Sequence, residues 1–265
     1  MLTCARNAVA GAARQKGNGK VDVFVSVTST ESKSSIKANF SNISMSTIKE
    51  DLNSMPDIGD VVVKEFDNSG ADIGPFIKML AHGDIASRNY DFVLKMHSNG
   101  DRLMRSHLIK SLCGSPEKVS SILDSFEENH EVDMIVPKGT VFGPRTDPSR
   151  IMPHLIKMYN IIEPPAATFD PMTQSNMNDV HNLIFPDWIK NHDEKKISAD
   201  DMAIAATTMF WIRYSALHPR NLADALPKLE FTSENKDNLG VEHAIQRLLA
   251  TEIILRKRKI AFTKL

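Results

Sequence analysis

The feature that most constrains the fold is an alternation of short apolar segments with segments of helical periodicity. Residues 21–27 (VDVFVSV), 61–66 (VVVKEF) and 133–137 (DMIVP) are short and rich in apolar side chains, as buried strands are. Between them, apolar residues recur every three or four positions, which is typical of the core-facing side of a helix. This order, without internal repeats, predicts an α/β fold with a mostly parallel sheet flanked by helices.

The remaining segments extend the same scheme. Further strands are predicted at residues 90–97 and 208–214, and helices at residues 44–55, 73–80, 115–126 and 240–259. Residues 1–20 carry four basic side chains and no acidic one, so we expect a disordered or truncated leading segment. Residues 21–265 are expected to form a single domain, because a chain of 265 residues can build one large α/β core.

Composition and charge exclude several classes of protein. A net charge of −1 argues against a nucleic-acid partner, which usually requires an excess of Lys and Arg. Two cysteines provide neither a disulfide framework nor a Cys-rich zinc site, and a cytoplasmic location is expected. No run of about 18 apolar residues is present to span a bilayer. The basic run at residues 256–259 (RKRK) predicts a solvated helix end, with peripheral membrane contact through anionic lipid as the alternative.

The junction at residues 68–76 (NSGADIGPF) has two interpretations. In the first, Gly70 forms a turn that needs a positive φ angle, and Asp72 caps the helix predicted at residues 73–80. In the second, the free backbone N–H groups at the start of that helix bind an anion. The residues alone leave both interpretations open.

Polar residues follow the predicted strands, as they would around a ligand site. In open parallel sheets, ligands bind at the carboxyl ends of the strands. Asn68 follows the second predicted strand, and His97 and Asn99 end or follow the third. The alternative is that polar residues simply mark where strands end.

Several of these segments resemble the rhamnan synthesis protein F family. NSGADIGPF matches the family's Asn-x-Gly-x-Asp-Ile/Val-x-Pro-Phe segment, and YDFVLKMHSN (90–99) is similar to its Tyr-Asp strand ending in Lys-x-His-Thr-Lys. LCGS (112–115) is similar to its Leu-x-Gly-Ser element. TTMFWIR (207–213) and HAIQRL (243–248) resemble its Gly-Thr-Met-Phe-Trp-x-Arg and His-Ala-Ile-Glu-Arg-Leu segments. The matches keep the family's order along most of the chain.

Four positions depart from the family's pattern. Ala71 replaces an arginine, Asn99 a lysine, Thr207 a glycine and Gln246 a glutamate. The expected site has thus lost two basic groups and one acid. This loss indicates either a shifted specificity or a weakened activity.

The resemblance implies a glycosyltransferase with the nucleotide-sugar-binding fold called GT-A. Such an enzyme would transfer rhamnose or a similar sugar from a nucleotide-sugar donor to a growing polysaccharide, another glycan or a lipid-linked acceptor. The positions it implies for donor binding are Asn68, Gly70, Asp72, Lys95, His97, Asn99, Thr208, Arg213 and Arg247.

The expected chemistry needs groups that absorb the charge of the leaving diphosphate and a base that takes the acceptor's proton. His243 and Arg247, four residues apart and opposite the apolar stripe of the terminal helix, are expected to contact the diphosphate. Asp72 is a second catalytic candidate, and Glu242 or Asp237 is the expected base. No Asp-x-Asp triplet that would hold Mn²⁺ or Mg²⁺ occurs, so no metal ligand is assigned and metal dependence stays open.

Two other function classes compete with this interpretation. A non-catalytic relative that binds nucleotide sugars or glycans would explain the lost basic groups. An unrelated nucleotide-dependent α/β enzyme, such as a methyltransferase, would place a Gly-rich loop after the first strand. Residues 25–32 (VSVTSTES) contain no glycine, which argues against that class.

Overall fold

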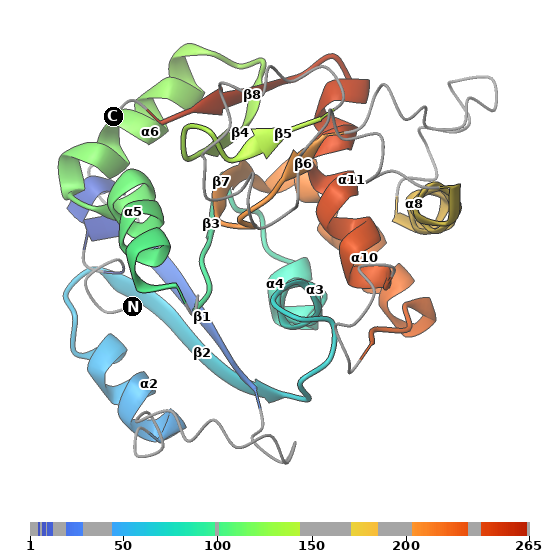
Figure 1. Cartoon of the computed structure of the whole chain (residues 1–265). Coiled ribbons are helices and arrows are strands. Elements are labelled where there is room, and N and C mark those ends of the chain that lie inside the picture. Colours follow the sequence, from blue (N-terminus) through green and yellow to red (C-terminus); the bar gives the residue numbers. More distant parts are fainter. Residues whose placement is uncertain are drawn as a thin grey trace. The chain divides into compact units, whose positions relative to one another are not determined.

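The chain divides into two compact units of helices and small sheets (Figure 1). The computed structural model describes residues 5, 7–8, 10–12, 20–28, 44–98, 101–143, 171–184, 203–232 and 240–263. The first unit comprises residues 1–68 and 99–129, and the second comprises residues 69–98 and 130–265. The stretch expected to form a single domain, residues 21–265, is therefore shared between two units.

In the first unit, a parallel pair of strands packs against a helix. β1 (Val21–Thr28) and β2 (Ile58–Phe66) pair in parallel, and α2 (Met45–Asn53) lies between them in the sequence and packs on β2. The strand–helix–strand order predicted for this region is confirmed. The buried core of this part is formed by Val25, Leu52, Met55 and Val61.

Two further helices belong to the first unit. α5 (Arg102–Cys113) begins after Asp101, whose carboxylate accepts a hydrogen bond from the Met104 N–H. α6 (Pro116–Glu128) begins after Ser115, which caps it as the sequence predicts. Within residues 1–20, expected to be disordered or truncated, the described residues 5, 7–8 and 10–12 are helical.

The second unit contains a mixed four-stranded sheet. Its strands, in pairing order, are β3 (Phe92–Lys95), β7 (Phe210–Arg213), β4 (Val132–Val136) and β8 (Lys259–Phe262). β7 runs antiparallel to β3 and to β4, whereas β4 and β8 are parallel. The prediction of a mostly parallel sheet is wrong for this unit, because apolar strand residues have the same pattern in either direction.

The other elements among the described residues of the second unit are short, apart from two helices. They are α3 (Ile73–Leu80), α4 (Gly83–Ala86), β5 (Val141–Phe142), α8 (Pro171–Ile184), β6 (Ile204–Ala205), η4 (Tyr214–Leu217), α10 (Pro219–Ala225), η5 (Leu226–Lys228) and α11 (Val241–Leu255). β5 and β6 form an antiparallel pair. No helix of the described residues is long and apolar enough to cross a membrane.

α11 is the helix around which the second unit packs. It contacts α3, α8, β4, β6 and β8, and Figure 1 shows it beside the strands of the sheet. Arg247, expected opposite the apolar stripe of this helix, is only 6% exposed, so that side of the helix is also buried at this position. The helix also ends earlier than predicted, at Leu255, because Lys259 and its neighbours pair with β4 as a strand. The basic run at residues 256–259 is therefore not a helix end.

Candidate functional site

Asp72 lies at the start of α3, in a turn with unusual backbone geometry. Gly70 and Ala71 have φ angles of 75° and 49°. A Cβ atom at Gly70 would lie 2.6 Å from the Phe231 ring, so this position requires glycine. Asp72 occupies the N-cap position, but its side chain makes no capping hydrogen bond. The capping interpretation of this residue is therefore wrong, and its carboxylate makes contacts elsewhere.

Lys95 fixes the Asp72 carboxylate from the end of β3. Its side chain is 3% exposed, and its Nζ donates to Asp72 Oδ2 at 2.6 Å. The same Nζ lies 5.5 Å from the centre of the Phe76 ring. Burial lowers the pKa of Lys95, and the charge of Asp72 offsets part of that effect. A buried ammonium group needs a charged partner, so Lys95 serves the carboxylate and does not reach solvent.

Thr208, which lies just before β7, contacts the same carboxylate. Its Oγ1 donates a short hydrogen bond to Asp72 Oδ2. Thr208 has a φ angle of 50°, which is a rare conformation for a β-branched side chain. Strained backbone of this kind persists only where surrounding contacts hold it, and it is concentrated at functional sites.

His97 follows β3 and completes a group of side chains around Asp72. Its Nε2 lies 3.7 Å from Asp72 Oδ2 and 3.1 Å from Thr208 Oγ1. Its Nδ1 lies 2.6 Å from the Ser98 carbonyl oxygen, and Nε2 lies 2.9 Å from the Thr207 carbonyl oxygen. A carbonyl oxygen can only accept, so a ring nitrogen that bonds one of them does so as an N–H donor.

We refer to Asp72, Lys95, His97 and Thr208 as the Asp72 cluster. Burial raises the pKa of Asp72, but the charges of Lys95 and His97 and hydrogen bonds from Lys95 and Thr208 outweigh burial and lower the pKa overall. The carboxylate is therefore ionised at neutral pH. Oδ2 receives these contacts, whereas no side chain of the described residues donates to Oδ1. With 28% of the side chain exposed, Oδ1 has hydrogen-bonding capacity for a ligand.

α11 carries two more of the candidate residues, His243 and Arg247. His243 lies in the first turn of the helix and is half-buried. Burial lowers its pKa below 6.5, against the opposing effects of Glu242, of a hydrogen bond with Gln246 and of the Asp72 charge. The Asp72 carboxylate is thus near enough to act on this ring. Arg247 Nη1 donates to the His243 carbonyl oxygen at 3.0 Å, one turn further along the helix.

Arg213 is not brought to the Asp72 cluster. It is the last residue of β7, whereas Thr208 precedes the first residue of that strand, so the two lie toward opposite ends. The Arg213 Nε donates to the Val132 carbonyl oxygen at 2.8 Å and lies 3.5 Å from Asp133 Oδ1. These contacts assign Arg213 to the packing of the sheet.

Of the two expected bases, the structure describes only Glu242, and its carboxylate is occupied. Glu242 is 2% exposed, and its carboxylate accepts hydrogen bonds from the Thr232 hydroxyl and, at 3.4 Å, from the Thr232 N–H. Asp237 and Asn99 lie outside the described residues. Asn68 is exposed and belongs to the first unit, where it ends the stretch of residues 1–68.

Sequence reasoning missed two residues that connect the site to α11. Thr232 accepts a hydrogen bond from the Gly70 N–H at 2.7 Å through its carbonyl oxygen while its hydroxyl bonds Glu242. Gln246, noted only as a departure from a family pattern, donates to the Ala206 carbonyl oxygen at 3.3 Å. Only Gln246 carried a signal, because it lies three residues after His243 on the same helix.

The described residues contain no group of three His, Cys, Asp or Glu side chains that could hold a metal ion.

A family model for rhamnan synthesis protein F matches residues 19–255. The chain belongs to the rhamnan synthesis protein F family. No curated protein and no solved structure matched the chain. Membership of the rhamnan synthesis protein F family connects the chain with polysaccharide synthesis.

Proposed function

We propose that the chain is a glycosyltransferase that moves a sugar, rhamnose or one similar to it, from a nucleotide-sugar donor to a glycan acceptor. The observation that carries this proposal is the open Oδ1 of an ionised, partly exposed Asp72. A carboxylate oxygen of this kind is a strong acceptor for a sugar hydroxyl. Family membership supplies the polysaccharide context, and the parallel β1–α2–β2 arrangement supports a GT-A-like fold.

In this proposal, Asp72 is the base that acts on the acceptor hydroxyl. Oδ1 accepts a hydrogen bond from that hydroxyl, whose oxygen attacks the anomeric carbon of the donor. The bond from that carbon to the diphosphate breaks, the diphosphate leaves with the electron pair, and the proton passes to Oδ1. A weakly basic carboxylate is sufficient, because positive charge on the sugar ring makes the hydroxyl acidic late in the reaction.

His97, His243 and Arg247 are proposed to stabilise the leaving diphosphate. His97 presents N–H groups from the end of β3, with 20% of its side chain exposed. His243 lies in the first turn of α11, where the helix dipole is positive. Arg247 adds a buried positive charge one turn behind it. Charge that is fixed in place before the reaction stabilises a leaving anion most effectively.

Donor binding tests the proposal first. A panel of nucleotide sugars is scored by the shift in melting temperature, with Mn²⁺ and with EDTA, because a ligand of the native state raises stability. At least one nucleotide sugar is expected to raise the melting temperature, and EDTA is expected to leave the shift intact, since Lys95 neutralises Asp72. A shift that EDTA abolishes and Mn²⁺ restores would contradict this expectation and show that donor binding depends on a metal ion.

Turnover tests it second. His243→Ala is expected to lower the rate of sugar transfer at least tenfold, about 1.4 kcal/mol, with little change in melting temperature. His130→Ala, which removes an exposed ring elsewhere in the second unit, is the matched control and is expected to retain the wild-type rate. Donor binding without transfer in the wild-type protein would favour the non-catalytic alternative.

A further inference from the structure

Two basic regions among the described residues, the run at residues 256–259 and α5, differ in their partners. In the run at residues 256–259, Arg256 bonds Glu252, Arg258 bonds Asp133 at 2.7 Å, and Lys259 lies 2.5 Å from Glu131. Three of its four cations are thus engaged by carboxylates of the protein itself. This run, which the sequence suggested as a contact for anionic lipid, has little charge left for an external partner.

α5 is the second of these regions, and two of its cations differ in this respect. The helix carries Arg102, Arg105 and Lys110, and no acidic residue occurs between residues 102 and 113. Arg102 and Lys110 are exposed, and no carboxylate among the described residues pairs with either. Exposed cations without an internal counter-charge are available to an anionic partner.

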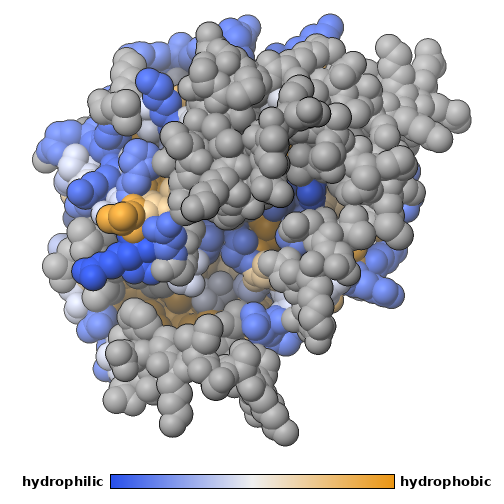
Figure 2. Space-filling model, viewed as in Figure 1, coloured by the Kyte–Doolittle hydropathy of each residue, from blue (hydrophilic) through white to orange (hydrophobic). Residues whose placement is uncertain are grey.

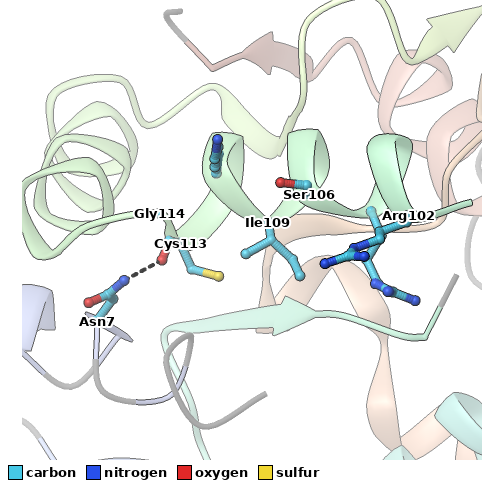
Figure 3. Close-up of a pocket in the computed structure, with 8 residues that line it drawn as sticks. Asn7, Arg102, Ser106, Ile109, Cys113 and Gly114 are labelled. Atoms are coloured by element: carbon cyan, nitrogen blue, oxygen red, sulfur yellow. Dashed lines mark hydrogen bonds between the residues drawn. The ribbon is translucent and has the colours of Figure 1, made fainter.

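These cations line a pocket of about 350 Å³ in the first unit. Figure 3 shows Arg102 toward one end of α5 and Cys113 at the other, with Ile109 between them. The Asn7 side chain closes the far end by donating to the Cys113 carbonyl oxygen at 2.8 Å. The lining therefore combines positive charge with apolar surface along one helix face.

An exposed leucine adjoins the same face. Leu103 is 84% exposed, the highest value among the exposed large apolar side chains of the described residues. It lies seven positions before Lys110, so the two project on the same side of α5. Figure 2 shows an apolar patch among hydrophilic side chains in the region of α5. An exposed leucine beside lysine and arginine offers a lipid–water interface one apolar side chain together with positive charge.

We propose that this face of α5, formed by Arg102, Leu103, Arg105, Ile109 and Lys110, docks the protein onto an anionic membrane surface. The basic side chains contact lipid phosphates, and Leu103 enters the boundary between head groups and acyl chains. A soluble phosphate compound would contact the cations but would offer no apolar surface to Leu103. Docking of this kind would bring the chain to a membrane surface, and this assignment does not depend on the glycosyltransferase proposal.

The test is co-sedimentation of the full chain with vesicles. Wild-type protein is expected to bind vesicles of phosphatidylcholine mixed with phosphatidylglycerol and to bind phosphatidylcholine vesicles much less. Arg102→Gln/Lys110→Gln is expected to weaken binding roughly fivefold per removed cation, on the order of twenty-five-fold in all. Leu103→Ser is expected to weaken binding at high salt most, because salt screens the charges but not the apolar contact.

The matched control is Lys49→Gln/Lys64→Gln, which removes two exposed cations from the same unit. Its vesicle binding is expected to equal that of the wild type. Equal weakening in both double variants would show a response to net charge and overturn the assignment to α5. Equal binding to both vesicle types, or full displacement from vesicles by inorganic pyrophosphate, would overturn it as well. None of these readouts measures sugar transfer, so failure here leaves the proposed reaction untouched.

Discussion

The carboxylates of Asp72 and Glu252, near opposite ends of α11, are contacted by similar types of side chain. Each lies beside a histidine and a basic side chain: His97 and Lys95 for Asp72, and His181 and Arg256 for Glu252. Glu252 is 3% exposed, and its two oxygens are divided between its partners, with His181 Nε2 at 2.9 Å from Oε2 and Arg256 bonded to Oε1.

The two carboxylates differ in the hydrogen-bonding capacity that remains. Both oxygens of Glu252 are occupied inside the protein, so this group can only hold α8, α11 and the following turn together. Asp72 receives its partners on Oδ2, keeps Oδ1 open among the described residues and is 28% exposed. The same residue types therefore form a structural contact in one place and a candidate site in the other, and spare acceptor capacity next to solvent distinguishes them.

The largest expected effect comes from Asp72→Asn. This change preserves shape but removes the negative charge, so sugar transfer is expected to fall on the order of a thousandfold, about 4 kcal/mol. The measurement is kcat for the donor that gives the largest melting-temperature shift. Because Lys95 would lose its counter-charge, circular dichroism must first show that the variant is folded. A folded variant with near wild-type kcat contradicts the assigned role.

The second effect concerns the other carboxylate. Glu252→Ala leaves the buried His181 without its acceptor and is expected to reduce the free energy of unfolding by about 3 kcal/mol. Denaturant titration measures that loss, and kcat per folded molecule is expected to stay at the wild-type level. A large drop in kcat with unchanged stability would reverse the comparison.

The third effect isolates the strain at Thr208. Thr208→Gly and Thr208→Ala both remove the hydroxyl that bonds Asp72, and they differ in the cost of the positive φ angle. The glycine variant is expected to be more stable by about 1 kcal/mol, as measured by denaturant unfolding. Both variants are expected to lose activity. Equal stabilities would mean that the backbone relaxes and holds no strain here.

The smallest effect is a pH dependence of stability. The pKa of Asp72 is lowered from 3.8 in the folded protein, so its ionised form contributes stability that is fully present above pH 3.8. That contribution is lost as the pH falls through the lower folded-state pKa. The difference in unfolding free energy between wild type and Asp72→Asn should therefore shrink as the solution becomes more acidic than pH 3.8. A constant difference across that window contradicts the lowered pKa.

Helices and strands were predictable from the sequence where a short local pattern determines them. Ser115 and Pro116 predicted the start of α6, and β-branched runs predicted β1 and β2. α5 was missed although Met104, Leu108 and Leu112 recur at helical spacing, because its many polar residues dilute that pattern. β8 was not predicted, and its first residue was assigned to a helix, because its pairing with β4 is a long-range contact that no local pattern reports.

The residues of the site were partly predictable, but the hydrogen bonds that occupy them were not. Lys95 and Thr208 lie 23 and 136 residues from Asp72 in the sequence, so no motif shows that they meet on one oxygen and leave the other open. The same limit applies to Glu242, whose carboxylate is occupied by Thr232. Residue types can be predicted from a pattern, whereas remaining hydrogen-bonding capacity depends on the folded neighbours.

The most direct test of the Asp72 cluster as the nucleotide-sugar site is histidine NMR during a donor titration. Imidazole resonances are assigned with single His→Gln variants, and a nucleotide sugar is then added to the wild-type protein. The resonances of His97 and His243 are expected to shift together and to saturate, while that of His181, next to Glu252, stays in place. A shift of His181 without shifts of His97 and His243 would contradict the assignment, and so would donor binding that moves none of the three.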